Sequence, residues 1–430
     1  MTVTSILSVV LCFIIVGVML LAMFNNYKVY KFSAYWVVSL LGAVVLLAIN
    51  YNKVGDILAG LITNTAINPL KILIFFLSMT IMSLVLDKLK FFQFLANKSA
   101  KLAKNSQWKL FFIFYAIVSI LTIFTSNDIV ILSFVPFICY FCKNHKINPT
   151  PYVFSTFVAA NTWSMLFIIG NPTNVYIGTF ANLTFIEYLL NMAIPTLVVG
   201  VTSLILLVVL FRKFLSKPIN NNENEEVVID RPLVIYNVSL LLSCIVLLAI
   251  SSYINLEMWI IALIFAVFQL LSNWFIALFR KREKNYIKGA IINAPWAFVP
   301  FLISMFLIIN TLNVTGVIEQ VAFIFGGNSP FIYGVGSFFA CNVINNIPMT
   351  TLFASILGNT TYTYQAIYSV IVGSNLGAIL SPVGALAGIM FLNILREKDV
   401  EFGVKTFIKY GSIISIVCIV VASCVVKLII

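Results

Sequence analysis

The sequence predicts an all-α integral membrane protein, a polytopic bundle of helices built from two similar halves. Three observations support this prediction: the composition, a series of apolar segments of membrane-spanning length, and a repeated order of polar interruptions. Hydrophobic residues make up 61% of the 430-residue chain and charged residues only 9%, and the mean hydropathy is +1.07. A soluble domain usually carries about 25% charged residues, and its surface could not cover so many apolar side chains. We therefore expect a multi-pass protein of the cell membrane, surrounded by lipid.

Apolar segments long enough to cross a bilayer follow one another along the chain. A hydrocarbon core about 30 Å thick requires roughly 20 apolar residues of helix. The candidate spans lie near residues 4–24, 33–50, 69–86, 109–124, 150–169, 187–211, 233–252, 257–279, 295–311, 331–357, 363–380, 383–395 and 406–429. The first of them has no basic region before it and no small-residue cleavage site, so we interpret it as a true span rather than a signal peptide.

A polar segment near the middle of the chain separates the two predicted halves. Residues 214–232 read FLSKPINNNENEEVVIDRP, a composition typical of a flexible linker or of an ordinary solvated loop between helices. The predicted organisation is a first membrane half over residues 1–213 with extra N-terminal helices, the linker over 214–232, and a second membrane half over 233–430.

Basic residues give the chain a net charge of +12, but they do not indicate a nucleic-acid partner. They gather in short segments between apolar runs, a distribution that marks the cytoplasmic side of a membrane protein. Two stretches, 90–105 and 281–291, mix Lys with apolar residues, so they could form amphipathic helices in the headgroup layer. The basic segments are 88–109, 211–217, 280–288 and 396–409.

Both halves interrupt their apolar segments with polar residues in the same order. In the first half, Ser126-Asn127-Asp128 is followed about forty residues later by Gly170-Asn171-Pro172-Thr173-Asn174. In the second half, Asn345-Asn346 is followed about thirty residues later by Ser374-Asn375 and then by Ser381-Pro382. Duplicated halves with matched interruptions are typical of secondary transporters, whose solute site lies where the repeats meet.

Asp128 is the carboxylate that the sequence places deepest in the membrane. A charged group at the bilayer centre costs at least about 2.5 kcal/mol, so it persists only where a partner, water or a cation offsets that cost. We interpret Asp128 as a proton-exchanging group. The alternative is a structural pair with Asn127 or with a free helix end.

The other interruptions supply neutral oxygen ligands. The predicted substrate-binding side chains are Asn127, Asn171, Thr173, Asn174, Asn345, Asn346, Ser374 and Asn375. The predicted helix breaks are Ser126, Gly170, Pro172, Pro348, Ser381 and Pro382, because Pro and Gly disrupt helices and Ser caps them. Within a bilayer, such breaks are tolerated only where protein buries them or where they line a water-filled cavity. For residues 170–174, hydropathy alone supports a turn at the end of a span equally well, but Asn161 and Ser164, upstream in the same apolar stretch, favour a cavity.

Soluble-enzyme chemistry has no support in the sequence. The chain has one His, His145, which argues against a Ser-His-Asp site or a multi-His metal site. It has no phosphate-binding P-loop motif, so it does not hydrolyse ATP itself. The seven Cys are scattered through apolar runs and form no metal-binding pattern. We expect a transporter that is not an enzyme and needs no cofactor or bound metal.

These motifs together resemble the arsenite and antimonite efflux permeases of the ion transporter superfamily. The resemblance covers the whole chain and is most specific in the second half. It rests on SLVLDKLKFFQFLA, TSNDIVILSFVPF, GNPTNVYIG, NVINNIPMTTLFASIL and SNLGAILSPVGALAGIMFLNIL. It implies two inverted-topology repeats with re-entrant hairpins, and proton-coupled export of arsenite and antimonite. It also implies a possible soluble ATPase partner, and a homodimer is possible.

Two departures from that family keep other substrates open. Residues 129–132 read Ile-Val-Ile-Leu where the permeases have small residues, and Gly-Asn-Pro-Thr-Asn replaces their usual Ser-Asn-Leu-x-Asn form. The form found here is common among sodium-proton exchangers and sodium-coupled carboxylate carriers. The alternatives are therefore a sodium-coupled organic anion carrier or a sodium-proton antiporter. A channel is a third hypothesis, but the internal duplication favours a carrier.

Overall fold

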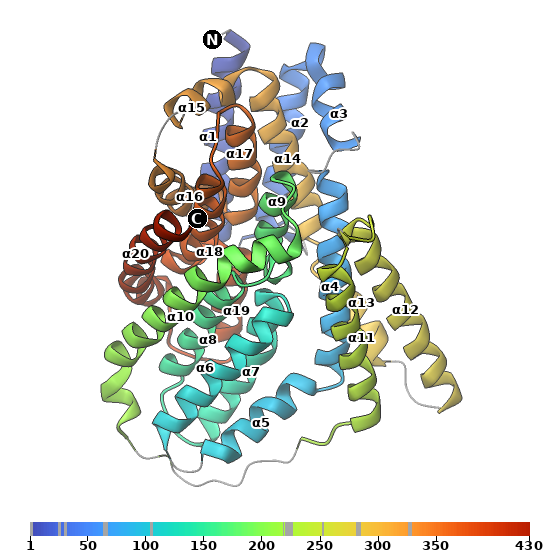
Figure 1. Ribbon diagram of the computed structural model, residues 1–430, viewed down its shortest axis with the longest axis vertical. Helices are drawn as coiled ribbons and strands as arrows, with labels where there is room; N and C mark the ends of the chain where they lie inside the picture. The colour runs from blue at the N-terminus through green and yellow to red at the C-terminus, as the bar shows by residue number, and fades with distance from the viewer. Residues whose placement is uncertain are drawn as a thin grey trace.

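The structure is a computed structural model that describes residues 3–24, 27–29, 32–62, 68–103, 106–217, 219, 227–251, 253–280, 285–325 and 329–430. These residues form a helical bundle (Figure 1) with one short antiparallel hairpin, β1 (Lys28–Val29) and β2 (Phe32–Ser33). The predicted all-α membrane fold is confirmed. Within the described ranges, seven helices are long and apolar enough to cross a membrane, or up to nine if each of two bent helix pairs counts as one span.

The helices up to residue 215 include both long spans and shorter pieces. Their bounds are α1 (Val3–Phe24), α2 (Ala34–Ile49), η1 (Tyr51–Lys53), α3 (Val54–Ile62), α4 (Pro69–Lys88), α5 (Phe91–Ala103), α6 (Gln107–Phe124), α7 (Asn127–Asn144), α8 (Thr150–Trp163), η2 (Ile168–Gly170), α9 (Pro172–Phe180) and α10 (Phe185–Leu215).

The helices from residue 231 onward repeat this order. Their bounds are α11 (Arg231–Ala249), α12 (Met258–Phe279), α13 (Asn285–Ile292), α14 (Phe298–Val314), α15 (Val317–Phe325), α16 (Pro330–Ile344), α17 (Asn346–Gly358), α18 (Tyr364–Leu380), η3 (Pro382–Gly384), α19 (Leu386–Glu397) and α20 (Val404–Ile429).

The packing of the two series is reciprocal. Helices α2 and α3 pack on α14, and their counterparts α12 and α13 pack on α4. In the same way α7 packs against α19, and α17 against α9. At the centre, α8 and α18 contact each other. The second half of each broken helix therefore lies against a hairpin arm from the other repeat.

Each repeat contains a re-entrant hairpin. The ring of Phe114 in α6 lies 6.5 Å from Phe137 and 6.4 Å from Phe141 in α7, so these two helices run antiparallel and the chain reverses at residues 125–126. In the second hairpin, the Tyr333 hydroxyl at the start of α16 lies 3.3 Å from the Thr360 hydroxyl just beyond α17.

Two of the expected spans differ from the structure at these interruptions, and one helix was not among the expected spans. The candidate span over 331–357 is two hairpin arms, α16 and α17, because the chain reverses at Asn345. The span over 150–169 ends at Trp163, where α8 breaks. Residues 127–144 form α7. They are absent from the spans expected from hydropathy because polar residues flank them.

Basic residues from distant parts of the chain meet at one end of the molecule. Lys143 and Lys398 line one cavity there, and Arg280 pairs with Asp230 at 3.4 Å. Figure 1 shows α5 at this end and the N-terminus at the opposite end. Stretch 90–105 forms helix α5 over Phe91–Ala103. Parts of three predicted segments lie outside the described residues. They are residues 104–105 of the first amphipathic stretch, 281–284 of the second, and 218 and 220–226 of the predicted linker.

Candidate functional site

The tip of the first hairpin is held to α8 by an amide hydrogen bond. Ser126 precedes α7 in an extended conformation, and Asn127 is its first residue. Both are buried. The Asn127 Nδ2 donates to Asn161 Oδ1 at 3.1 Å, while its Oδ1 accepts from the Asp128 backbone N–H at 2.9 Å. Asn127 therefore fixes the hairpin tip.

Asp128 occupies the second position of α7. Its side chain is half-buried, and no described residue forms a hydrogen bond or ion pair with its carboxylate. A carboxylate in the first turn of a helix is favoured by the helix dipole, but that effect is small beside the cost of charge in a bilayer. Asp128 is thus an acid that the described residues leave unneutralised.

The break between α8 and α9 depends on two Asn side chains. Asn171 caps α9, its Oδ1 accepting from the Thr173 N–H at 3.2 Å, and Pro172 fills the first helical position. The Asn174 Nδ2 donates to Ser164 O at 2.8 Å, which satisfies a carbonyl that the break leaves free. Gly170 is required here because a Cβ at this position would lie 2.3 Å from Ser164 O.

Asn375, in the middle of α18, joins this break to the second half of the chain. Its Oδ1 accepts from Asn171 Nδ2 at 2.9 Å and from Ser164 Oγ at 3.2 Å. Its Nδ2 donates to Asn174 Oδ1 at 2.7 Å and to Ile371 O at 2.8 Å. All of these groups are buried, so the amide of Asn375 has its hydrogen-bonding capacity fully used.

The tip of the second hairpin has a strained backbone. Asn345 adopts φ +73° and ψ 155°, a combination that is essentially restricted to glycine. Its Nδ2 donates to Val383 O in η3 at 3.0 Å. Asn346 begins α17, and Pro348 takes the third helical position, where no intrahelical N–H bond is needed.

The break between α18 and α19 is fastened to the same hairpin. Pro382 opens η3. The Ser381 Oγ donates to Asn342 Oδ1 at 2.6 Å, and the Asn342 Nδ2 donates to Gly377 O at 3.0 Å. Asn342 in this half, like Asn161 and Ser164 in the first, was not among the predicted site residues. Their polar character inside apolar runs was the available signal.

The predicted site residues fall into two groups by hydrogen bonding. Asn127, Asn171, Asn174 and Asn375 are bonded to protein and frame the breaks. A second group has buried side-chain oxygens with no hydrogen-bond partner, and each lies at a hairpin tip or beside the amide cluster. Leaving such an oxygen unpaired costs about 1–3 kcal/mol, so this group is the candidate ligand set. Its members are Ser126 Oγ, Thr173 Oγ1, Asn345 Oδ1, Asn346 Oδ1 and Ser374 Oγ.

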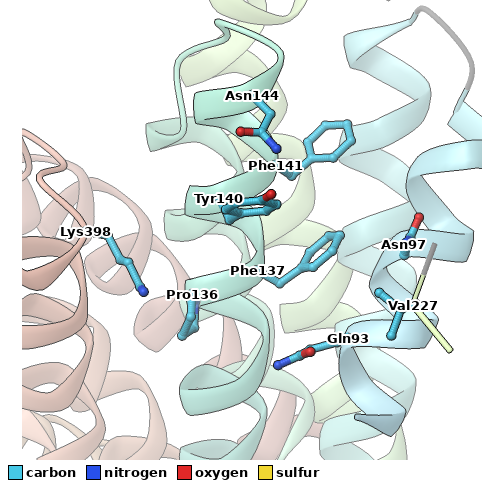
Figure 2. A pocket seen from close by; sticks show the side chains of 9 residues that line it. All are labelled: Gln93, Asn97, Pro136, Phe137, Tyr140, Phe141, Asn144, Val227 and Lys398. Atoms are coloured by element: carbon cyan, nitrogen blue, oxygen red, sulfur yellow. The ribbon is translucent and has the colours of Figure 1, made fainter. Parts of the chain in front are cut away.

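The outer part of α7 lines a cavity of about 290 Å³ at the basic end. Figure 2 shows Gln93 of α5 and Lys398, which follows α19, both pointing toward Pro136. Phe137, Tyr140 and Phe141 provide aromatic walls. Pro136 lies eight residues from Asp128 on the same helix, which corresponds to about 12 Å. The cavity therefore opens along the hairpin arm that carries the unpaired acid.

Replacing Asn375 should destabilise the protein through the groups that it leaves unpaired. In Asn375→Ala, buried groups of Asn171 and Asn174 lose their partner, and we expect a loss of about 2–4 kcal/mol. Equilibrium unfolding in mixed detergent micelles measures it. The control is Ser369→Ala on the same helix, whose buried hydroxyl has no partner, so that its removal leaves no group unpaired and should not lower stability. Equal stability of the two variants would contradict the bridging role.

Replacing Asn345 tests the strain at the second hairpin tip. Asn345→Gly and Asn345→Ala both lose the bond to Val383 O, but only glycine relieves the backbone. After the entropic cost of glycine, we expect Asn345→Gly to be more stable than Asn345→Ala by about 1–2 kcal/mol. The same unfolding assay compares them, and a glycine variant no more stable than the alanine variant would show that the tip is unstrained.

Comparison with known proteins agrees with this architecture. Residues 18–367 match the family model described as citrate transporter, CitMHS. Relatives include an uncharacterized transporter of Mycobacterium tuberculosis, 23% identical over 79% of this chain and 81% of the relative. The arsenical pump membrane protein of Escherichia coli is 23% identical, covering 79% of this chain and 82% of its own. A putative arsenical pump membrane protein of Bacillus subtilis is 24% identical over 79% and 83%.

A solved structure supports the fold. The Alcanivorax borkumensis YdaH transporter, described as having an unusual topology, matches 99% of this chain and 98% of its own with a TM-score of 0.53 and 13% identity. The resemblance to arsenite permeases seen in the sequence is confirmed, since arsenical pump membrane proteins are among the relatives. The family model covers most of the chain, so the protein belongs to the citrate transporter family and is a secondary membrane transporter.

Proposed function

We propose that this protein exports arsenite and antimonite in exchange for protons. The observation that carries the proposal is the set of buried, unpartnered, neutral oxygens of Ser126, Thr173, Ser374, Asn345 and Asn346. They come from both repeats and lie at the two hairpin tips, beside the first break and beside the amide cluster. We assign solute binding to them, and we assign the bonded Asn residues to holding the frame.

The charge of the site favours a neutral solute. Undissociated arsenite is a small uncharged triol at neutral pH, so it can donate and accept hydrogen bonds without needing a cation. In the described part of the chain, no Lys or Arg is hydrogen-bonded to any predicted site residue. Two relatives carry the name of arsenical pump membrane proteins, which agrees with this choice of solute.

Asp128 is the proposed proton carrier. Among the described residues its carboxylate has no hydrogen-bond or ion-pair partner, and it lies in the first turn of a hairpin arm, where an uncompensated charge is costly. Taking up a proton removes that cost, and releasing it toward the cavity on α7 restores the charge. An ion gradient would then supply the energy. Association with a soluble ATPase or with a second copy of the chain stays a prediction.

A second candidate is a sodium-coupled carrier of an organic anion. The matching family model is described as citrate transporter, and α7 and α17 both begin at hairpin tips. Helix N-termini at a break attract carboxylates, and broken-helix carbonyls suit sodium. In the described ranges no Lys or Arg is hydrogen-bonded to the site residues to hold a carboxylate, so we rank this candidate second. A sodium-proton antiporter would use the same sodium ligands with Asp128.

Everted membrane vesicles test the proposal. We expect arsenite to accumulate in them only when a pH gradient is imposed, and Asp128→Asn to lower this accumulation at least tenfold because the side chain can no longer release a proton. The control is Asp87→Asn, at the end of α4, whose carboxylate lies 3.5 Å from Lys88 and whose loss should leave transport within twofold. Sodium-dependent citrate flux with no arsenite flux would establish the second candidate instead.

A matched pair of serines on α18 tests the ligand set. Both Ser374 and Ser369 are buried with unpartnered hydroxyls, but only Ser374 adjoins the amide cluster. We expect Ser374→Ala to raise the arsenite KM about fivefold or more, because one hydrogen bond to solute contributes about 1 kcal/mol. Ser369→Ala should leave the KM unchanged. Initial rates in the same vesicles measure both, and equal effects would reject Ser374 as a ligand.

A further inference from the structure

Two cysteines lie one helical turn apart on the hairpin arm α7 and take no part in the transport steps proposed above. Cys139 and Cys142 are both free and buried. Residues three apart on a helix are neighbours with Cβ atoms about 5–6 Å apart, and these two thiols lie close enough to interact electrostatically. Every other Cys in the sequence is at least six residues from the next, so this neighbouring spacing occurs once.

Cys139 lines a cavity of about 460 Å³ at the basic end. The loop that leads into α8, over residues 147–150, and the segment 398–401 beyond α19 also line it. Its charged residues are two lysines and two carboxylates, Lys143, Lys398, Asp399 and Glu401. Lys398 lines the aromatic cavity on α7 as well, so the two spaces adjoin.

The cysteine pair shares a face of α7 with Asp128. Asp128 and Cys139 are eleven residues apart, which corresponds to three helical turns and about 16 Å along the axis. Cys142 lies almost one turn further from Asp128. A solute held by the two thiols is therefore already on the face of the arm that carries the proposed proton carrier.

We propose that Cys139 and Cys142 capture trivalent arsenic or antimony at the basic end before transport. This inference rests on the proposed function for its choice of solute. Arsenite has three hydroxyls on one arsenic atom, and two thiols replace two of them. Each As–O bond that breaks is exchanged for an As–S bond, and each thiol proton leaves with the hydroxyl as water. Arsenic stays trivalent, so no oxidant or reductant is needed, and water reverses both exchanges to release the triol.

Burial of the pair favours this chemistry over binding of a metal cation. A charged group is costly where water is excluded, whereas the chelate of two sulfurs and one remaining hydroxyl on arsenic is neutral. Zn²⁺ is charged and usually takes four ligands. Within the described ranges, no group of three or more His, Cys, Asp and Glu side chains is placed to hold a metal ion.

Binding of phenylarsine oxide to the purified full-length protein in detergent tests the pair. Its arsenic exchanges one oxygen for two sulfurs, so tight binding requires two neighbouring thiols. Intact-mass spectrometry should show one retained adduct per chain, which 2,3-dimercaptopropanol removes and 2-mercaptoethanol at the same thiol concentration does not. We expect Cys139→Ala combined with Cys142→Ala to lower the retained adduct at least tenfold. Each single variant should lose its adduct to 2-mercaptoethanol.

The matched control removes two other cysteines from one helix. Cys418→Ala combined with Cys424→Ala in α20 removes thiols that are six residues apart and lie on different faces of their helix, so it should retain the adduct within twofold of the wild type. Absence of an adduct in the wild-type protein would overturn the proposal. An adduct that persists in the Cys139/Cys142 variant, or that the control loses equally, would also overturn it.

Transport by the same variants separates this inference from the proposed function. In everted vesicles, we expect the Cys139/Cys142 double variant to raise the arsenite KM at least threefold, because solute is no longer concentrated at the arm. The control variant should leave the KM unchanged, and equal KM values for the two variants would reject the capture role. Absence of arsenite flux in the wild type would instead overturn the proposed function, while the binding result, which requires no transport, would stand.

Discussion

Inside a bilayer, a broken helix must find partners for its free backbone groups without water. Asn side chains meet this requirement at the breaks and hairpin tips of this protein. The side-chain amide of Asn174 donates a hydrogen bond to the Ser164 carbonyl. In the same way Asn342 donates to the Gly377 carbonyl, and Asn345 donates to the Val383 carbonyl. Asn375 then joins the first break to the second repeat. The two inverted repeats can meet at their broken helices α8 and α18 because these amides satisfy the interrupted backbone.

Hydrogen bonding also distinguishes the side chains that hold the backbone from the side chains of the proposed solute site. An amide with both ends bonded holds backbone in place, whereas in the proposed function one with a free oxygen receives the solute. Asn345 does both, since its nitrogen bonds Val383 while its oxygen stays unpaired. It does so in a backbone conformation that costs about 1–3 kcal/mol. Strain of this kind persists only where the surrounding structure enforces it, and here the enforcing contact comes from η3 of the same repeat.

At the basic end the two repeats meet again, through longer side chains. Lys398, just beyond α19, shares a cavity with Gln93 of α5 and with the arm of the first hairpin. An adjoining cavity shares two lining residues, Asn97 and Val227, with that space.

The sequence by itself determined the membrane class, the repeated order of interruptions and the residues at each break, because hydropathy and the cost of polar groups in lipid depend on residue type alone. It also singled out Asp128. It could not distinguish a through-going span from a hairpin over 331–357, since both have the same hydropathy and differ only in where the chain turns. Nor could it separate Asn375, fully bonded, from Ser374 beside it, unbonded. That difference is created by partners about two hundred residues away in the chain, which only the tertiary structure brings into contact.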